Sequence, residues 1–395
     1  MILIDNKFSN KFIAKYSTNI TVLLNNTLYP AYLKANNVPI AFQDFYTANL
    51  NDIIIGTPDK LKHIADDLFL TFPIIEETYQ PKKFYSGYPS SLRRIVAQMA
   101  HLKLNKKDDK KKFTLLASKL LPILESFIKS KRSHCLPGLL SIITASKSLR
   151  EQSDIYALIY SLVRGRATVT SGIPDWVKNL SSLFDYSKIS ANLLFDLCSN
   201  INIAVCPMCN ESNIEVIHKG KHRPALDHFF AKSRHPLFGM SLYNLIPCCD
   251  TCNSTFKRDF ETWYPYHANP YQQGVGSTPL FNLKAFTTAS LYQGGRLQNK
   301  ANNKINIIPQ HNDIDNNMRL LKTELVYNRS VPLQKLSHLL AVIGQYQNGM
   351  YPKHSVDAVL ELFDYDNARH ALADPYRKLK YDTINAFLPA FVVKF

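Results

Sequence analysis

Two Cys-x-x-Cys pairs in the middle of this chain constrain its fold more than any other feature. Five of the seven cysteines lie between Cys206 and Cys252. A pair of this spacing forms a tight turn that presents two thiolates, and two such pairs supply the four ligands of a closed tetrahedral zinc site. The sequence therefore predicts that the long segment between the pairs is pinned at both ends by one metal ion.

The zinc ligands predicted from this spacing are Cys206, Cys209, Cys249 and Cys252. Cys248 stands beside Cys249, but only Cys249 and Cys252 repeat the two-residue gap of the first pair. We therefore expect Cys248 to be a small, buried, apolar side chain.

The segment between the pairs carries residues suited to a second, catalytic metal ion. Asp227 and His228 follow the apolar run Pro224–Leu226, and Asn253 directly follows the last cysteine, where it can cap a helix over Ser254–Trp263. Zinc binding would bring Asn253 close to Asp227 and His228. One carboxylate and one amide oxygen suit Mg²⁺ or Mn²⁺. A neutral imidazole beside such an ion can deprotonate a water for attack on a phosphate.

This pattern, C-P-x-C, D-H and N-L-x-P-x-C-x-x-C-N, resembles the HNH nucleases over about 60 of the 395 residues. The resemblance implies a zinc-stapled ββα-metal fold with the four cysteines as structural zinc ligands. It implies that His228 is the general base and that Asp227 and Asn253 bind the catalytic Mg²⁺ or Mn²⁺. It also implies that Asn244 braces the loop carrying the histidine. Lys257 follows Asn253 by four positions, where the family often has three, and is given no role.

The alternative hypothesis is a zinc-containing nucleic-acid-binding or scaffold protein without catalysis, with His228 at the surface. We favour the nuclease because a structural zinc ribbon has no need of an acid–histidine pair. The sequence leaves the place of His235 open. This residue either approaches the metal or the leaving group, or lies in a loop that contacts backbone phosphate or nothing.

The net charge of +16 and the pI of 9.4 favour a polyanionic partner, although a Lys-rich composition alone can give the same values. Between residues 205 and 264 we count seven Lys and Arg against six Asp and Glu, so the charge excess lies in the flanking regions. The predicted partner is DNA, with RNA not excluded, and the flanks must then supply much of the contact to its phosphates.

The predicted fold class is α+β, with mainly α-helical flanking regions around a central zinc-bound ββα-metal module. The expected domains are a helical N-terminal domain (1–200), the nuclease module (201–275) and a mainly helical C-terminal region (276–395). The expected flanking helices are 57–68, 90–99, 113–129, 139–145, 154–163, 187–197, 316–326, 333–347, 355–363, 369–373 and 376–387.

Two features of the N-terminal region remain undecided from the sequence. The runs Ile20–Leu24 and Asp52–Gly56 are too short to separate a buried strand from a buried helix. The most basic stretch, Lys103–Arg132, is either a solvated loop or a phosphate-contacting surface. The helical region is accordingly either a DNA clamp or a module that docks a partner.

Cysteine usage and hydropathy predict a cytoplasmic protein without membrane contact. The start of the chain lacks a signal-peptide pattern, no run of about 18 apolar residues occurs, and the cysteines are grouped for metal binding. Cys135 and Cys198 lie outside this group and are expected to be buried. The resemblance extends to uncharacterised prokaryotic nucleases, including those of anti-phage defence and restriction, which implies a defence role and a regulatory protein partner.

Overall fold

The computed structural model describes the chain apart from residues 6–7, 87–88, 164–171, 218–221, 264–265, 284–285, 287–303, 351–355 and 392. The fold is α+β and mostly helical, as predicted, and its described part contains two small antiparallel sheets of two strands each. The buried apolar side chains of this part form three clusters. No helix among the described residues is long and apolar enough to cross a membrane.

The first apolar cluster is shared between the N-terminal helices and the cysteine-rich segment, residues 206–252. The helical segments around it are α1 (Asn10–Leu23), a π-helical turn (Leu24–Leu28), α2 (Tyr29–Ala35), α3 (Ile40–Ile55), α4 (Pro58–Thr71), α5 (Pro73–Tyr79), α11 (Asp175–Lys178), α12 (Leu180–Leu183) and α13 (Ala191–Ile201). In α1, Phe12, Tyr16 and Ile20 recur every four residues and are buried on one face. The undecided run Ile20–Leu24 and residues 52–55 of the run Asp52–Gly56 therefore belong to helical segments and not to strands, and Gly56 directly follows α3.

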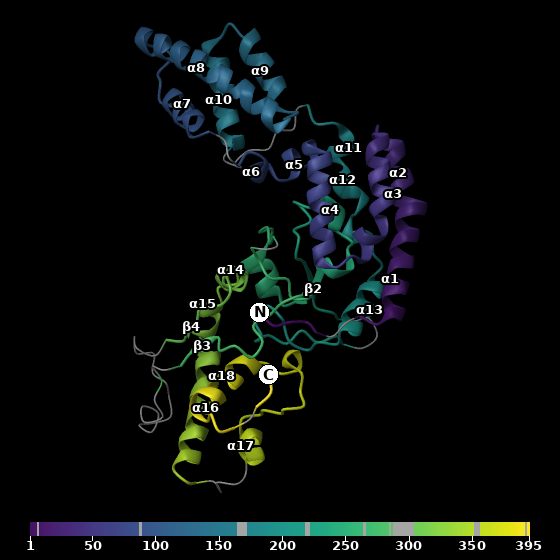
Figure 1. The fold of residues 1–395 in the computed structure, drawn as a ribbon, viewed down its shortest axis with the longest axis vertical. Helices are drawn as coiled ribbons and strands as arrows, with labels where there is room; N and C mark the ends of the chain where they lie inside the picture. Colours follow the sequence, from purple (N-terminus) through teal and green to yellow (C-terminus); the bar gives the residue numbers. More distant parts are fainter. Residues whose placement is uncertain are drawn as a thin grey trace.

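The second cluster is the core of a separate helical bundle. Its elements are α6 (Pro81–Phe84), α7 (Ser90–Ala100), α8 (Lys107–Lys131), α9 (Leu136–Ala145) and α10 (Leu149–Val163). Figure 1 shows α7 to α10 at the top of the molecule, beyond α5 and α6. Most of the basic stretch Lys103–Arg132 is the helix α8, so of the two alternatives left open the loop is wrong for Lys107–Lys131.

Glu77 on α5 joins this bundle to the N-terminal helices. Its side chain is buried and accepts hydrogen bonds from the hydroxyl groups of Tyr85 (2.5 Å) and Ser133. The backbone N–H groups of His134 (2.7 Å) and Cys135 (3.3 Å) donate to the same carboxylate. A buried carboxylate with this many donors has its hydrogen-bonding capacity satisfied, so Glu77 fixes the start of α9 relative to α5.

The third cluster is the core of the C-terminal region, and Met1 packs into it. Its elements are β3 (Phe281–Asn282), β4 (Asn306–Ile307), α14 (Asn312–Leu320), α15 (Thr323–Tyr327), α16 (Ser330–Gln347), α17 (Val356–Leu362) and α18 (Arg377–Phe387). The helix predicted over 316–326 is divided between α14 and α15, and the one predicted over 369–373 is a single 3₁₀ turn, Ala371–Ala373. Residue 355, the first of the helix predicted over 355–363, lies outside the described residues.

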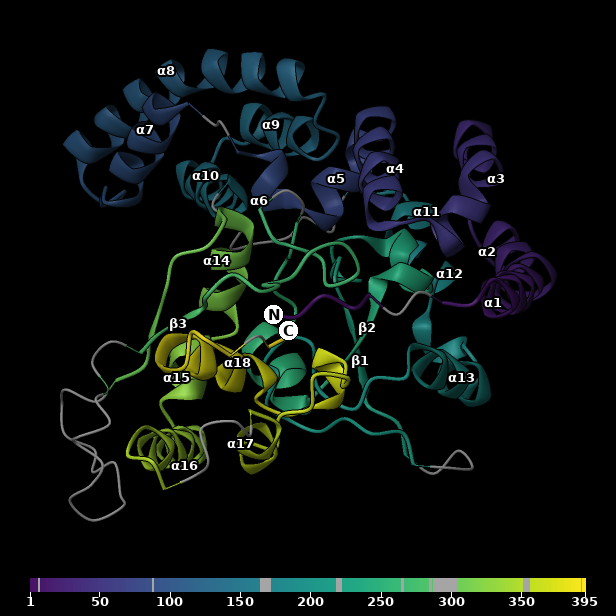
Figure 2. The same ribbon diagram turned by 60° about the horizontal axis from the view of Figure 1, so that its bottom comes forward.

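The first cysteine pair is held by the start of the chain and by the C-terminal region. Near the start, the Ile2 backbone N–H donates to the Pro207 carbonyl (2.7 Å). From the C-terminal region, the Tyr327 hydroxyl donates to the Cys209 carbonyl (2.8 Å). Figure 2 shows both termini near the middle of the molecule, between the N-terminal and C-terminal helices. The cysteine-rich segment is therefore central in space as well as in sequence.

Candidate functional site

The four cysteines predicted to bind metal lie together. The Sγ atoms of Cys206, Cys209, Cys249 and Cys252 all lie within 4.8 Å of one another, and those of Cys209 and Cys249 are 4.0 Å apart. Four thiolates bound to zinc at about 2.3 Å in a tetrahedron are about 3.8 Å from one another. The cluster could therefore hold a metal such as zinc with little movement. Cys248 is buried outside the cluster, as the spacing predicted.

Asn210, which the sequence analysis did not single out, fixes the first cysteine turn to the C-terminal region. Its φ of 53° is in the left-handed region, which Asn tolerates better than most residues. Its buried amide donates to the Ala371 carbonyl (3.1 Å) and accepts from the Lys378 backbone N–H (3.0 Å). The available signal was an Asn placed directly after a Cys-x-x-Cys turn.

A short antiparallel pair of strands delivers the acid and the histidine. The strands are β1 (Ala225–His228) and β2 (Leu245–Cys248). Asp227 and His228 are the last two residues of β1 and lie opposite the first two residues of β2. Because β2 ends directly before Cys249, metal binding at the cysteine cluster would fix the sheet that carries Asp227 and His228.

The helix after the second cysteine pair differs from the prediction. We expected a helix over Ser254–Trp263 capped by Asn253, but the structure has a π-helical turn over Thr251–Lys257 with Asn253 inside it. The turn ends because Arg258 has φ 52° and ψ −127°, which no helix accommodates. The predicted cap and the predicted length are therefore both wrong.

A pocket of about 310 Å³ brings the predicted catalytic residues together. Asp227 and His228 from β1 and Asn253 from the helical turn all line it. Exposed Lys232 and Arg258 lie at the same pocket and give it two cationic side chains. The structure thus places the adjacent residues Asp227 and His228 and the distant residue Asn253 around one cavity.

His228 is held in one orientation at this pocket. Its side chain is 9% exposed, its Nε2 lies 3.0 Å from the Gly239 carbonyl oxygen, and its ring meets Tyr186 edge-on at 5.1 Å between centroids. Because a carbonyl oxygen only accepts, Nε2 carries the proton and Nδ1 is free to accept one. Burial lowers the pKa of His228 to about 4, so the imidazole is neutral at pH 7.

The position of Gly239, whose carbonyl contacts His228, requires a residue without a side chain. A Cβ at this residue would lie 2.2 Å from the Phe184 backbone oxygen. The glycine therefore lets the loop approach the end of α12 closely and keeps its carbonyl aimed at His228.

Lys257 forms a buried ion pair with Asp227, which the sequence did not reveal. Its Nζ lies 3.1 Å from Asp227 Oδ1 and 2.7 Å from the His228 carbonyl oxygen, and the Lys257 and Asp227 side chains are 2% and 3% exposed. Burial raises the pKa of Asp227, and the ammonium of Lys257 opposes this shift. The available signal was the position of Lys257 four residues after Asn253, about one helical turn onward.

The second oxygen of Asp227 is the atom that fits a metal ion best. Asp227 Oδ2 is buried and has no hydrogen-bond partner among the described residues. A buried carboxylate oxygen without a partner is costly, and a divalent ion would satisfy it. Asn253 lines the same pocket and has an amide oxygen to contribute. The donor set at this pocket therefore fits the hard, sparse site expected for Mg²⁺ or Mn²⁺.

Asn244 makes the bracing contacts expected of it. The residue is fully buried, and its Oδ1 accepts from the Phe230 backbone N–H (2.6 Å). Its Nδ2 donates to the carbonyl oxygens of Phe230 (3.1 Å) and Phe238 (2.9 Å). Since Gly239 follows Phe238 directly, these bonds also fix the carbonyl that orients His228.

Replacing Asn244 by alanine is expected to destabilise the protein by about 2–4 kcal/mol. The buried N–H and carbonyl of Phe230 lose their side-chain partner, and the Phe238 carbonyl keeps only the bond from the Ser241 N–H. Denaturant unfolding followed by circular dichroism measures this change. The exposed Asn192 provides the control, since Asn192→Ala is expected to change stability by less than about 0.5 kcal/mol. Equal stability of the two variants would contradict the bracing role.

Both readings offered for His235 are wrong, because this residue is part of the core. Its ring is 2% exposed and stacks on Trp263 at 5.0 Å and on Phe238 at 5.7 Å between centroids. Its Nε2 lies 3.0 Å from the Gln80 side-chain nitrogen. His235 is therefore buried in the core and does not line the pocket.

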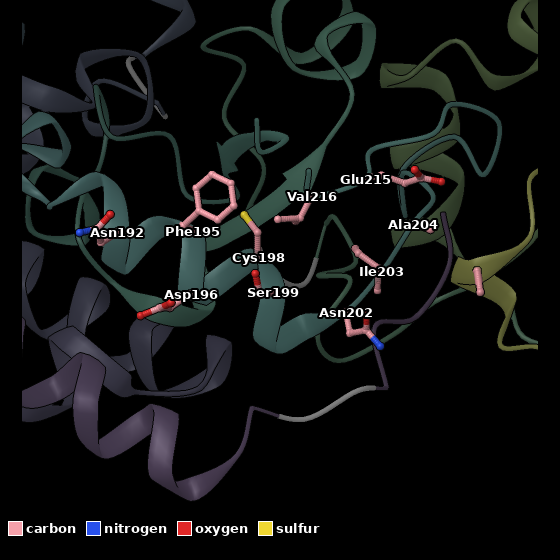
Figure 3. Close-up of a pocket in the computed structure, with 11 residues that line it drawn as sticks. Asn192, Phe195, Asp196, Cys198, Ser199, Asn202, Ile203, Ala204, Glu215 and Val216 are labelled. Atoms are coloured by element: carbon pink, nitrogen blue, oxygen red, sulfur yellow. The ribbon is translucent and has the colours of Figure 1, made fainter. Parts of the chain in front are cut away.

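A larger cavity lies elsewhere, and its lining includes the carboxylates of Asp196 and Glu215. It has a volume of about 800 Å³ and lies between α13 and the segment that follows it. Figure 3 shows Phe195, Cys198 and Val216 gathered at its centre.

Burial raises the pKa of the Cys198 thiol to about 12, as it does that of Cys135, so both thiols are unreactive. The prediction that these two cysteines are buried is confirmed.

Compared with known proteins, the chain matches no family model, no curated protein and no solved structure. The chemistry of the site must therefore be argued from its own residues.

Proposed function

We propose that this protein is an HNH-type endonuclease that hydrolyses phosphodiester bonds of DNA with a divalent metal ion. The observation that carries the proposal is the convergence of Asp227, His228 and Asn253 on one pocket next to the cysteine cluster. A neutral imidazole, an unpartnered carboxylate oxygen and an amide oxygen are the groups that metal-assisted phosphodiester hydrolysis requires.

The roles of the residues follow from their contacts. His228 donates from Nε2 to Gly239, so Nδ1 can take the proton of an attacking water. Lys257 holds the Asp227 carboxylate and the His228 backbone in fixed positions. A divalent ion bound by Asp227 and Asn253 would stabilise the negative charge that develops on the phosphate and the leaving oxygen.

Two exposed cations at the pocket support a nucleic-acid substrate. Lys232 and Arg258 each carry one positive charge at the pocket and exposed Asp259 carries one negative charge, so the exposed side chains that line it have a net positive charge. Contacts of this kind position a phosphate backbone without reading its sequence. Other parts of the molecule must then bind the rest of the substrate.

One observation favours the second candidate, a zinc-containing nucleic-acid-binding protein without catalysis. The ammonium of Lys257 already occupies one oxygen of Asp227 inside the protein. An acid neutralised in this way attracts a divalent ion less strongly than a free carboxylate. The two candidates differ in a single measurable property, the cutting of DNA in the presence of metal.

We expect the zinc-loaded protein to convert supercoiled plasmid to open or linear forms when Mg²⁺ or Mn²⁺ is added, and to leave it intact without added metal. Agarose gels over a titration of each ion measure this. Labelled duplex DNA, single-stranded DNA and RNA in parallel identify the substrate. Binding of these nucleic acids without cutting at any metal concentration would favour the second candidate.

A further inference from the structure

The positive charge of this protein is concentrated in one helical bundle. Residues 81–163 contain 16 Lys and Arg against five Asp and Glu, so they hold 11 of the 16 net positive charges in about a fifth of the chain. The same residues form the separate bundle around its own apolar core. The charge therefore belongs to one structural unit that lies apart from the pocket in the sequence.

Nearly all cations of this bundle are exposed and make no ion pair within the described part of the chain. Every Lys and Arg of residues 81–163 is exposed except Lys131, which is half-buried. Within the described part of the chain, Lys83 is the one member of this set in an ion pair, with Glu76 at 3.4 Å. Asp108 and Asp109 lie among the lysines at the start of α8, but neither forms an ion pair within the described part of the chain. Like charges three or four residues apart on a helix destabilise it, so the lysines of this group do not stabilise α8. Such a surface is suited to a polyanion.

The spacing of the cations along α8 fits duplex DNA. One group, Lys106, Lys107, Lys110 and Lys111, lies at the start of the helix, and a second, Lys129 with Arg132, lies at its end. At 1.5 Å per residue the groups are about 30 Å apart. One turn of B-DNA is about 34 Å, so both groups can meet phosphates on the same side of a duplex.

The apolar face of α8 disfavours a membrane surface as the partner. Its buried residues belong to the bundle core, and Leu115 is the one exposed large apolar side chain of this helix, so α8 has no exposed apolar stripe that could insert into lipid. A helix that binds a membrane through charge also inserts such a stripe into the headgroup region.

We propose that the bundle α6–α10 is a duplex-DNA-binding arm that binds the substrate apart from the cleavage pocket. The role of the arm in cleavage rests on the proposed function, whereas its binding of DNA is supported by the charge and geometry of the bundle. The near-neutral nuclease segment needs such an arm, because sequence-independent affinity for DNA comes from neutralised phosphates. Glu77 couples the arm to α5 and so sets its direction relative to the rest of the molecule.

The test replaces Lys106, Lys107, Lys110 and Lys111 together by glutamine. All four side chains are exposed, so the fold is expected to persist. Fluorescence anisotropy with a 30-base-pair duplex, without divalent ions, is expected to show at least a tenfold loss of affinity. The slope of log K against log salt is expected to fall by about 3 to 4, since each lost phosphate contact removes about 0.9.

The matched control replaces four exposed lysines outside the bundle by glutamine: Lys11, Lys34, Lys60 and Lys322. It has the same net charge as the test variant and is expected to keep its affinity within about threefold. An equal loss in both variants, or an unchanged affinity in the test variant, would overturn the arm. Tighter binding of single-stranded RNA than of duplex DNA would overturn the choice of partner. Because this assay measures binding without cutting, its result is independent of whether the protein is a nuclease.

Discussion

In the variant His228→Ala, metal-dependent cutting of plasmid is expected to fall by about 10²- to 10⁴-fold, the usual contribution of a positioned general base. The wild-type imidazole is neutral because it is buried, and Gly239 fixes the nitrogen that carries its proton. Alanine removes the only imidazole that lines the pocket among the described residues. Single-turnover cleavage at saturating Mg²⁺ isolates the chemical step, and DNA affinity is expected to stay unchanged.

The control for this variant is His222→Ala. His222 precedes His228 by six residues on the same segment, is exposed, and does not line the pocket. We expect this variant to cut at the wild-type rate. Because His228 also packs against Tyr186, zinc content and thermal unfolding of His228→Ala must be measured beside its activity. A folded, zinc-loaded His228→Ala protein that cuts like the wild type would show that another group is the base.

The cysteine cluster was predictable because the spacing of the cysteines is a local sequence pattern. Two-residue gaps between cysteines determine which thiolates can share one ion, and this settled the choice of Cys249 over Cys248. The placement of Asp227 and His228 at the end of a strand followed from the apolar run before them. The ion pair of Asp227 with Lys257 was missed because it depends on how the helical turn packs on β1, which no local pattern encodes.

The larger errors came from tertiary packing. His235 lies between Arg234 and Pro236 in a segment that reads as a loop, yet Trp263, far along the chain, stacks on it and buries it. The predicted helix over Ser254–Trp263 stops early because Arg258 takes a positive φ at the point where Lys257 turns inward. Both cases show long-range contacts overriding a local preference.

The helical flanks were predictable where the apolar period was long. In α4 and α7, the period of three to four residues gave the helices and their buried faces correctly. In α1 the short window Ile20–Leu24 was ambiguous, although a longer one would have included Phe12 and Tyr16 at the same spacing. The division of residues 1–200 between two apolar cores follows from the chain leaving the first core at α6 and returning at α11, which the sequence does not mark.

Replacing Cys206 by serine is expected to abolish zinc binding and to unfold the central segment. Structural zinc in small domains binds with an apparent free energy of about 10–16 kcal/mol, which is comparable to the entire stability of a domain, about 5–15 kcal/mol. Cys206 is fully buried and belongs to the first apolar cluster. Its loss therefore leaves three thiols in the core without a metal ion that they can share. The Tyr327 bond to Cys209 ties the C-terminal region to the same turn, so we expect its packing to loosen too.

Zinc content by metal release and thermal unfolding by calorimetry measure this effect, with Cys248→Ala as the control. Cys248 is buried beside Cys249 but lies outside the cluster, so the control is expected to keep one zinc per chain and a melting transition close to that of the wild type. Chelation of zinc from the wild-type protein should reproduce the behaviour of Cys206→Ser, because both remove the same cross-link. A Cys206→Ser protein with full zinc content and normal melting would mean that Cys206 is not a ligand, and the cross-link that positions Asp227, His228 and Asn253 would then need another origin.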